Sequence, residues 1–183
     1  AFDPEVLAHY REEIEYMISK GIRPMLTLHH FTNPLWFEDM GAWENTKSPQ
    51  IFLTFVRKVI ESFGDIVSEY ITINEPNVYA TNSFLWGYWP PEKKSAFSMI
   101  DVFSNMTAAH ILSYNYIHAR RAEMGYNDTK VSFANHLRVF EPKDKKNALH
   151  RMASSAAEYL FQGAVTDAMM TGKLRFPIVL WRK

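Results

Sequence analysis

The alternation of helical and short apolar segments is the feature of this sequence that most limits its possible folds. Helical spacing of apolar residues predicts four helices, bounded by cap or stop residues, at Pro4 to Lys20, Ser48 to Phe63, Ser95 to Met124 and Asn147 to Met170. Shorter apolar segments between them predict three strands, at Ile22 to Phe31, Ile66 to Asn74 and Lys130 to Val139. Strands that alternate with helices of this length indicate βαβ units and a parallel α/β sheet.

Two α/β architectures contain such units, an open doubly wound sheet and a (β/α)8 TIM barrel. A doubly wound nucleotide fold usually has a glycine-rich turn after its first strand. Here residues 29–34, HHFTNP, follow the first strand and contain no glycine. The sequence therefore favours the barrel. Because a whole barrel typically needs about 250 residues, we expect residues 1–183 to form a single partial (β/α)8 domain.

Charge and composition exclude several classes of function. The chain has 20 Lys plus Arg and 20 Asp plus Glu, so its formal charge is +0, whereas nucleic-acid-binding proteins usually carry a basic excess. No apolar run approaches the ~18 residues of a membrane span, and we expect no membrane partner. With Cys 0, thiol nucleophiles and cysteine zinc sites are excluded, and we predict neither a metal nor a cofactor. The absence of cysteine fits a reducing compartment, so we expect a cytoplasmic location.

The most informative segment for chemistry is residues 72–76, TINEP, at the end of the second predicted strand. In a (β/α)8 barrel, active sites lie at the carboxyl ends of the strands. Shielding by aromatic loops would favour the protonated form of Glu75, which could then donate a proton to a leaving oxygen. The simpler alternative is that Asn74 and Glu75 only cap the segment that follows.

Two histidines, His29 and His30, end the preceding strand. Neighbouring strands are about 4.8 Å apart, so one of these side chains could reach the same pocket as Glu75. Because side chains alternate along a strand, only one of the two should face the site, which makes a metal pair an unfavourable interpretation. The alternative is a buried histidine with a satisfied hydrogen bond.

Aromatic residues follow both strands, namely Trp36, Phe37, Trp43, Trp86, Tyr88 and Trp89. Sugars present flat C–H faces that stack on indole rings, and their hydroxyl groups bind amides, carboxylates and imidazoles. A site with this mixture suits a carbohydrate. We expect at least half of these six rings to be packed beneath loops instead.

Five motifs in order resemble glycoside hydrolase family 1, the β-glucosidase family. Residues 21–31, GIRPMLTLHHF, are similar to the family's G-I-x-P-x-V-T-L-x-H-[WF] strand, and residues 41–45, GAWEN, to its G-G-W-x-N loop. Residues 63–65 and 70–76 resemble F-G-D followed by W-x-T-x-N-E-P. Residues 87–91 resemble G-x-x-P-P, and residues 109–119 the H-N-x-x-x-A-H-A helix. The resemblance covers roughly barrel strands 3 to 5.

The resemblance implies a retaining β-glycosidase acting on a β-glycoside or oligosaccharide. In that family Glu75 matches the general acid/base, Asn74 the residue that binds the 2-hydroxyl group, and His30 a histidine of the −1 subsite. Phe31 falls where the family often has a tryptophan that lines this subsite. Retaining enzymes use two carboxyl groups about 5–5.5 Å apart, one as acid/base and one as nucleophile.

The family's nucleophile lies in an E-N-G motif, and the sequence contains no such motif. We therefore expect the isolated chain to be inactive, as a segment of a longer glycosidase. The alternative is a non-catalytic barrel fragment that binds sugars or self-associates, because three open parallel strands expose two edges for pairing.

Overall fold

The computed structural model describes residues 2–175, which form a three-stranded parallel sheet. The strands are β1 (Met25–Thr27), β2 (Glu69–Asn74) and β3 (Lys130–Ala134), and they lie in the order β1-β2-β3. This order follows the sequence, so each connection is a βαβ crossover to the next strand, as the predicted α/β class requires.

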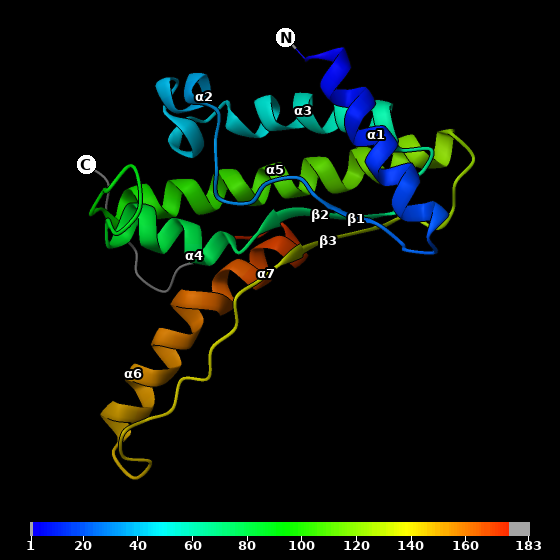
Figure 1. Ribbon diagram of the computed structural model, residues 1–183. Coiled ribbons are helices and arrows are strands. Elements are labelled where there is room, and N and C mark those ends of the chain that lie inside the picture. Colours follow the sequence, from blue (N-terminus) through cyan, green and yellow to red (C-terminus); the bar gives the residue numbers. More distant parts are fainter. Residues whose placement is uncertain (1, 176–183) are drawn as a thin grey trace.

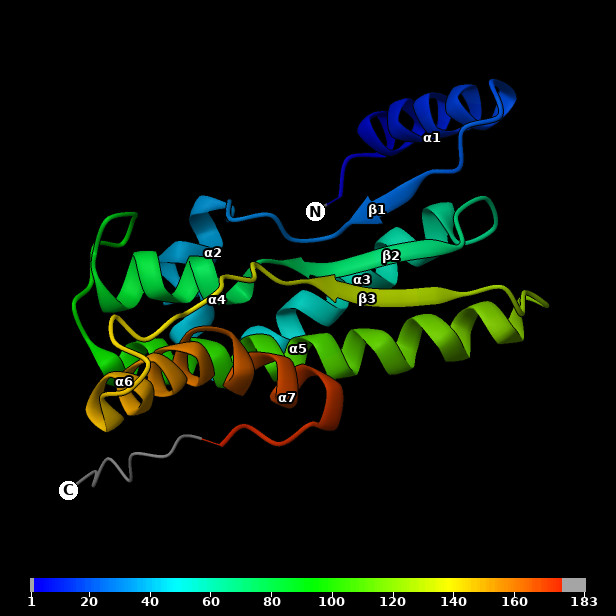
Figure 2. The ribbon, with the colours of Figure 1, turned by 90° about the horizontal axis from the view of Figure 1, so that it is seen from below.

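Helices connect the strands and cover one face of the sheet. Their bounds are α1 (Pro4–Ser19), α2 (Leu35–Asp39), α3 (Ser48–Phe63), α4 (Pro76–Ala80), α5 (Ala96–Glu123), α6 (Ala148–Glu158) and α7 (Ala164–Thr171). Helix α5 packs on β2 and β3, and α3 packs on α5 (Figure 1). Figure 2 shows the three strands side by side, with α1 beyond β1 and the α6–α7 arm beyond β3.

Capping residues fix where the long helices begin. The Asp3 carboxylate accepts the backbone N–H of Glu5 at 2.9 Å at the start of α1. The Ser95 hydroxyl accepts the N–H of Ser98 at 3.2 Å, and Asn147 accepts that of Leu149 at 2.9 Å. Each cap satisfies an N–H that the helix itself leaves unpaired. These starts confirm the helix boundaries predicted from the sequence to within one residue.

The strand register separates the sheet into two faces. Leu26, Tyr70 and Val131 form one row across the strands and belong to the hydrophobic core beneath the helices. The next row, Thr27, Ile71 and Ser132, faces away from the helices. In a closed barrel this second face forms the interior, where side chains from neighbouring strands stack in layers.

All three strands are shorter than expected, and the sequence-based boundaries were wrong there. The second strand was predicted from Ile66, but β2 begins at Glu69. The prediction ran to Val139, but β3 ends at Ala134, and beyond it the His136 carbonyl accepts a hydrogen bond from the Asn77 amide at 2.8 Å instead of pairing with a strand. Likewise β1 ends at Thr27, before the predicted Phe31, although the His29 N–H still donates to the Thr72 carbonyl at 3.1 Å.

The segment directly after β2 is helical, and a loop follows from Trp86. Pro76 begins α4, which continues into the π-helical turn η2 (Thr81–Leu85). The final predicted helix is one helical run interrupted by a second π turn, η3 (Tyr159–Gly163). A short 3-10 turn, η1 (Ala42–Glu44), precedes α3. Within residues 2–175, the helices lack the combination of length and apolar character that crossing a bilayer demands.

Candidate active site

The carboxyl ends of the three strands are joined by backbone hydrogen bonds at one edge of the sheet. The Asn74 N–H donates to the His29 carbonyl at 2.9 Å, and the Glu75 N–H donates to the Ala134 carbonyl at 2.8 Å. The register between β2 and β3 also shifts between Ile71 and Asn74, where β2 contains one extra residue. Such bulges re-aim the side chains that follow them, and they are frequent next to active sites.

Glu75 sits at this edge in a left-handed backbone conformation, with φ 43° and ψ 57°. This region is costly for a residue with a Cβ, and such strain clusters at functional sites. Glu75 precedes α4, yet its side chain makes no capping hydrogen bond. The Glu75 side chain is 30% exposed, and its Oε1 lies 3.3 Å from His136 Nδ1. The capping interpretation of Glu75 was therefore wrong.

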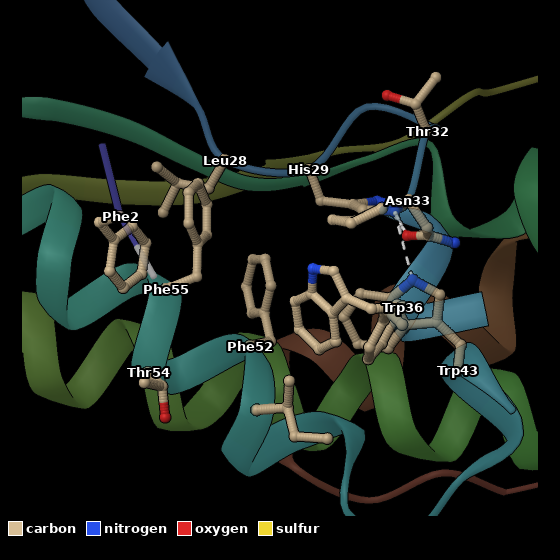
Figure 3. Close-up of a pocket in the computed structure, with 13 residues that line it drawn as sticks. Phe2, Leu28, His29, Thr32, Asn33, Trp36, Trp43, Phe52, Thr54 and Phe55 are labelled. Carbon is tan, nitrogen blue, oxygen red and sulfur yellow. Dashed lines mark hydrogen bonds between the residues drawn. The ribbon is translucent and has the colours of Figure 1, made fainter. Parts of the chain in front are cut away.

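His29 belongs to the opposite, helix-covered side of the strand. Its ring is buried, and its Nε2 lies 3.2 Å from the Trp43 indole nitrogen and 3.1 Å from Asn33 Oδ1 (Figure 3). Burial lowers the pKa of His29 to about 4, which keeps the ring neutral near pH 7. The alternative of a buried, hydrogen-bonded histidine therefore holds for His29.

A cavity of about 800 Å³ lies beside His29 on this side. Aromatic rings from α2, η1 and α3 line it, among them Phe37, Trp43 and Phe52 (Figure 3). Glu75 and His30 are not among its lining residues. The largest described cavity is thus separate from the predicted sugar site, which lies at the strand ends and is open to solvent.

His30 is exposed, as the one histidine expected to face the site should be. Its ring packs edge-on against Phe31 at 4.7 Å between centroids, and Phe31 in turn contacts Trp89 at 5.0 Å. Phe31 has φ 67°, so the backbone turns sharply where β1 leaves the sheet. Phe31 and Trp89 together form an aromatic wall from two separate loops, of the kind on which a sugar ring stacks.

The six aromatic residues singled out from the sequence are less buried than we expected. Phe37 and Trp43 are buried, at 5% and 0% exposure, and Trp89 is half-buried. The other three rings are exposed: Trp36 at 55%, Trp86 at 43% and Tyr88 at 75%. The expectation that at least half would be packed beneath loops was wrong, because Trp86 and Tyr88 are exposed after η2 and Trp36 is exposed on α2.

Sequence reasoning missed the polar residues that follow β3. His136 contacts Glu75, and the guanidinium Nε of Arg138 lies 3.1 Å from His136 Nε2. Asn77 binds both backbone groups of His136, accepting its N–H at 3.4 Å and donating to its carbonyl at 2.8 Å. The position of His136 in the sequence could have indicated this contact, because His136 follows the third strand as Glu75 follows the second. The overlong predicted strand concealed it.

The remaining predicted site residue, Asn74, is half-buried at the end of β2, between the strand ends that carry His30 and His136. The structure thus gathers Asn74, Glu75, His30 and Phe31 at one edge of the sheet. Among residues 2–175, no three side chains of the His, Asp and Glu type form a group that could hold a metal ion. The arrangement offers a carboxyl group, an amide and an imidazole beside an aromatic wall, which is suited to proton transfer on a polyhydroxylated ligand.

Comparison with known proteins gives consistent results. The chain has 32% identity to a β-glycosidase from Pyrococcus horikoshii, with a TM-score of 0.86 over 96% of this chain and 39% of that one. It is 27% identical to a β-galactosidase of Pyrococcus woesei over 92% of this chain and 37% of the relative. It is 29% identical to a chloroplastic galactolipid galactosyltransferase of Arabidopsis thaliana over 78% of this chain and 24% of the relative.

The chain therefore spans between a quarter and two fifths of the length of these proteins, and its three strands form part of a TIM barrel. The sequence model of the glycosyl hydrolase family 1 matches residues 2–179, nearly the whole chain. The five motifs, the parallel βαβ units and the site at the strand ends agree with this match. The chain belongs to glycosyl hydrolase family 1.

Proposed function

We propose that this chain is the segment of a retaining β-glycosidase that carries the general acid/base, Glu75. The observation that supports this most directly is the placement of the Glu75 carboxyl group. It lies at the carboxyl end of a barrel strand in a strained backbone conformation, partly buried and free of any capping role. The family to which the chain belongs includes the β-glycosidase and β-galactosidase of the two Pyrococcus species.

In the first step, protonated Glu75 gives its proton to the glycosidic oxygen as the bond from that oxygen to the anomeric carbon breaks. A carboxylate nucleophile, supplied by a part of the enzyme outside these 183 residues, forms an ester with the anomeric carbon. The ionised Glu75 then takes a proton from water, whose oxygen attacks the anomeric carbon and displaces the nucleophile. Two inversions leave the configuration retained, and Glu75 is protonated again.

Asn74, His30 and Phe31 bind the sugar in this proposal. Asn74 would hold the 2-hydroxyl group, where hydrogen bonds strengthen as the oxocarbenium character develops. His30 is exposed at the neighbouring strand end and can bond a second hydroxyl group. Phe31, backed by Trp89 at 5.0 Å, offers the apolar surface for the C–H face of the ring.

The 183-residue chain alone should not hydrolyse an aryl β-glucoside above background, since it contains no E-N-G motif. The activity test therefore uses a hybrid enzyme. In the hybrid, this chain replaces the matching segment of the Pyrococcus horikoshii β-glycosidase, and that protein supplies the remaining strands. We expect the hybrid to hydrolyse aryl β-glycosides with retention of configuration.

The decisive variant of the hybrid is Glu75→Ala. General acid/base catalysis contributes about 10²–10⁴-fold, so turnover of a substrate with a poor leaving group should fall by that factor. Azide should restore the second step, because this small anion attacks the ester without a base, and the product should be the β-glycosyl azide. The matched control is Glu69→Gln, a carboxyl group at the other end of β2 that pairs with Lys130 at 3.1 Å.

A folded hybrid in which Glu75→Ala retains full activity, or gives an α-glycosyl azide, would contradict the proposal. Product analysis also separates hydrolysis from glycosyl transfer. Release of free sugar supports hydrolysis, whereas transfer to an added sugar acceptor would point to the reaction named for the galactosyltransferase relative. Glu69→Gln should change thermal stability more than turnover.

We propose as a second property that the isolated chain self-associates through its sheet edges. Within residues 2–175, β1 and β3 each pair with β2 alone, so each has one open side. Unpaired edges are templates for strand addition. Light scattering of the 183-residue chain should show dimers or larger species at high concentration. A stable monomer would argue against this, and calorimetric titration with glucose would test the sugar-binding version.

A further inference from the structure

A line of polar contacts leads from Glu75 into the loop after β3. Glu75 Oε1 lies 3.3 Å from His136 Nδ1, and the other ring nitrogen, His136 Nε2, lies 3.1 Å from Arg138 Nε. Both nitrogens of His136 are thus engaged, one by the proposed acid/base and the other by a guanidinium group. This inference rests on the function proposed above for Glu75.

The chemistry of arginine determines which nitrogen of His136 carries the proton. A guanidinium group can only donate hydrogen bonds, so His136 Nε2 must accept with its lone pair. The ring is then neutral, with its proton on Nδ1, and this N–H donates to Glu75 Oε1.

Several contacts hold this loop in place. Asn77 binds both backbone groups of His136. Gln162, from η3, accepts the backbone N–H of Arg138 at 2.7 Å and donates to its carbonyl at 3.0 Å. The Arg138 guanidinium also stacks over the Phe161 ring at 4.8 Å. The position of Arg138 relative to His136 is therefore fixed by elements on both sides of the loop.

We propose that Arg138 and His136 are positioning residues for Glu75. Arg138 fixes the Nδ1–H tautomer of His136, and this N–H holds Oε1 of Glu75 in one orientation. Within residues 2–175, Oε2 has no hydrogen-bond partner and is left to exchange the proton with substrate and water. No covalent bond to His136 or Arg138 forms or breaks.

The choice of tautomer matters because Glu75 must alternate between two protonation states. An Nδ1–H donor can bond Oε1 whether the carboxyl group is ionised or carries its proton on Oε2. With the other tautomer, the bare Nδ1 would accept a hydrogen bond only from protonated Glu75, and it would compete for the proton that the leaving group needs. Arg138 thus prevents His136 from diverting the catalytic proton.

The tautomer can be read directly from the ¹⁵N shifts of the imidazole nitrogens in the labelled 183-residue chain, recorded at pH 8. His136 is assigned by the signal that the His136→Gln variant loses. We expect the Nδ1–H pattern in the unmodified chain. Arg138→Met should convert it to Nε2–H or to a mixture, whereas Arg138→Lys, which keeps a donor, should preserve it.

Arg151→Met is the matched control, since Arg151 lies on α6 and donates to the carbonyl groups of Lys145 and Lys146. It should leave the His136 pattern unchanged. His9 provides an internal reference, because it forms a second His–Glu pair, with Glu13 at 3.3 Å, that lies on the exposed surface of α1. An Nε2–H pattern in the unmodified chain, or an unchanged pattern in Arg138→Met, would overturn the proposal.

A second measurement uses the hybrid enzyme. Arg138→Met should lower kcat by about tenfold or more for a substrate whose leaving group needs protonation, and much less for a dinitrophenyl glycoside. Arg138→Lys should restore most of the loss. If hydrolysis depends on Glu75 but His136 has the Nε2–H tautomer, the positioning role is refuted and the acid/base assignment stands. The predicted tautomer without hydrolysis that depends on Glu75 would refute the acid/base assignment and leave only a structural role for the pair.

Discussion

His29 and His30 are adjacent in sequence but lie in opposite environments. The His29 ring is buried, contacts Trp43 and Asn33, and packs against Tyr79 at 5.6 Å between ring centroids. His30 is exposed, and its ring packs only against Phe31 among the described residues. The first histidine belongs to the packed layer between sheet and helices, and the second to the open edge where the proposed chemistry occurs.

The same contrast separates the two sides of the strand ends more generally. On the helix side, the buried Thr72 hydroxyl is paired, because it lies 2.7 Å from His110 Nδ1. On the site side, Phe31 and Glu75 both adopt positive φ angles and keep exposed polar or aromatic surface. We infer that stability comes mainly from the helix side, where the hydrophobic core lies.

Replacement of Trp43 should give the largest effect on stability. Trp43 has no exposed surface and packs against Phe37 and Phe52 at 5.5 Å, so Trp43→Ala leaves a large cavity and removes one of the two hydrogen-bond partners of His29 Nε2. We expect a loss of about 3–5 kcal/mol in the free energy of unfolding, measured by urea denaturation. Trp36→Ala is the matched control, because Trp36 is 55% exposed, and it should cost less than about 1 kcal/mol.

Similar losses for the two tryptophan variants would mean that the buried Trp43 contributes no more to stability than the exposed Trp36. The comparison also tests the cavity beside His29, since both tryptophans line it.

Much of the fold followed from the sequence because periodicity and capping are local properties. Helix α3 was predicted with its final bounds, since apolar residues recur on one face and Gly64 follows. The parallel order of the strands followed from the alternation alone. The single partial domain over residues 1–183 and the cytoplasmic location stay predictions.

The site was only partly predictable. Glu75, Asn74, His30 and Phe31 lie in contiguous motifs at the ends of two strands, so they could be read from the sequence. The partner of Glu75 could not, because His136 is 61 residues away and lies beyond the end of β3, where its carbonyl accepts a hydrogen bond from Asn77. Strand ends are set by such long-range contacts, which local patterns do not contain.

The buried histidine on the helix side should make stability depend on pH. Burial lowers the pKa of His29 from 6.5 to about 4, so the unfolded chain binds a proton between these values that the folded chain does not. The contribution of the neutral His29 ring to the free energy of unfolding is therefore fully present above pH 6.5 and is lost as pH falls toward 4. The difference is about 3 kcal/mol, at 1.36 kcal/mol for each pH unit.

Urea denaturation gives the free energy of unfolding of the unmodified chain and of His29→Gln at pH 7.5 and at pH 4. The contribution of His29 is the amount by which the difference between the two proteins changes from one pH to the other. His110→Gln offers an independent second case on the same side, because burial lowers the pKa of His110 to about 4 as well. If the unmodified chain and His29→Gln lose the same free energy of unfolding between pH 7.5 and pH 4, the His29 ring is not buried as described.

The smallest expected effect concerns the backbone of Glu75. With φ 43°, this residue occupies a region that asparagine tolerates better than glutamate does. Glu75→Asn should therefore leave the chain as stable as before or stabilise it by up to about 1 kcal/mol, while abolishing the proposed catalysis in the hybrid. Glu75→Gln removes the same charge but retains the unfavourable backbone preference, so it should change stability by less than about 0.5 kcal/mol.

This pair of variants distinguishes backbone strain from charge at the proposed acid/base. A gain in Glu75→Asn alone means that the chain accepts a less stable backbone in order to present a longer carboxyl side chain at the strand end. An equal gain in both variants would instead attribute the cost to the buried part of the carboxylate. A loss of stability in both variants would show that the contact of Glu75 with His136 stabilises the fold. Side-chain contacts at the strand ends would then contribute to the free energy of unfolding, as those on the helix side do.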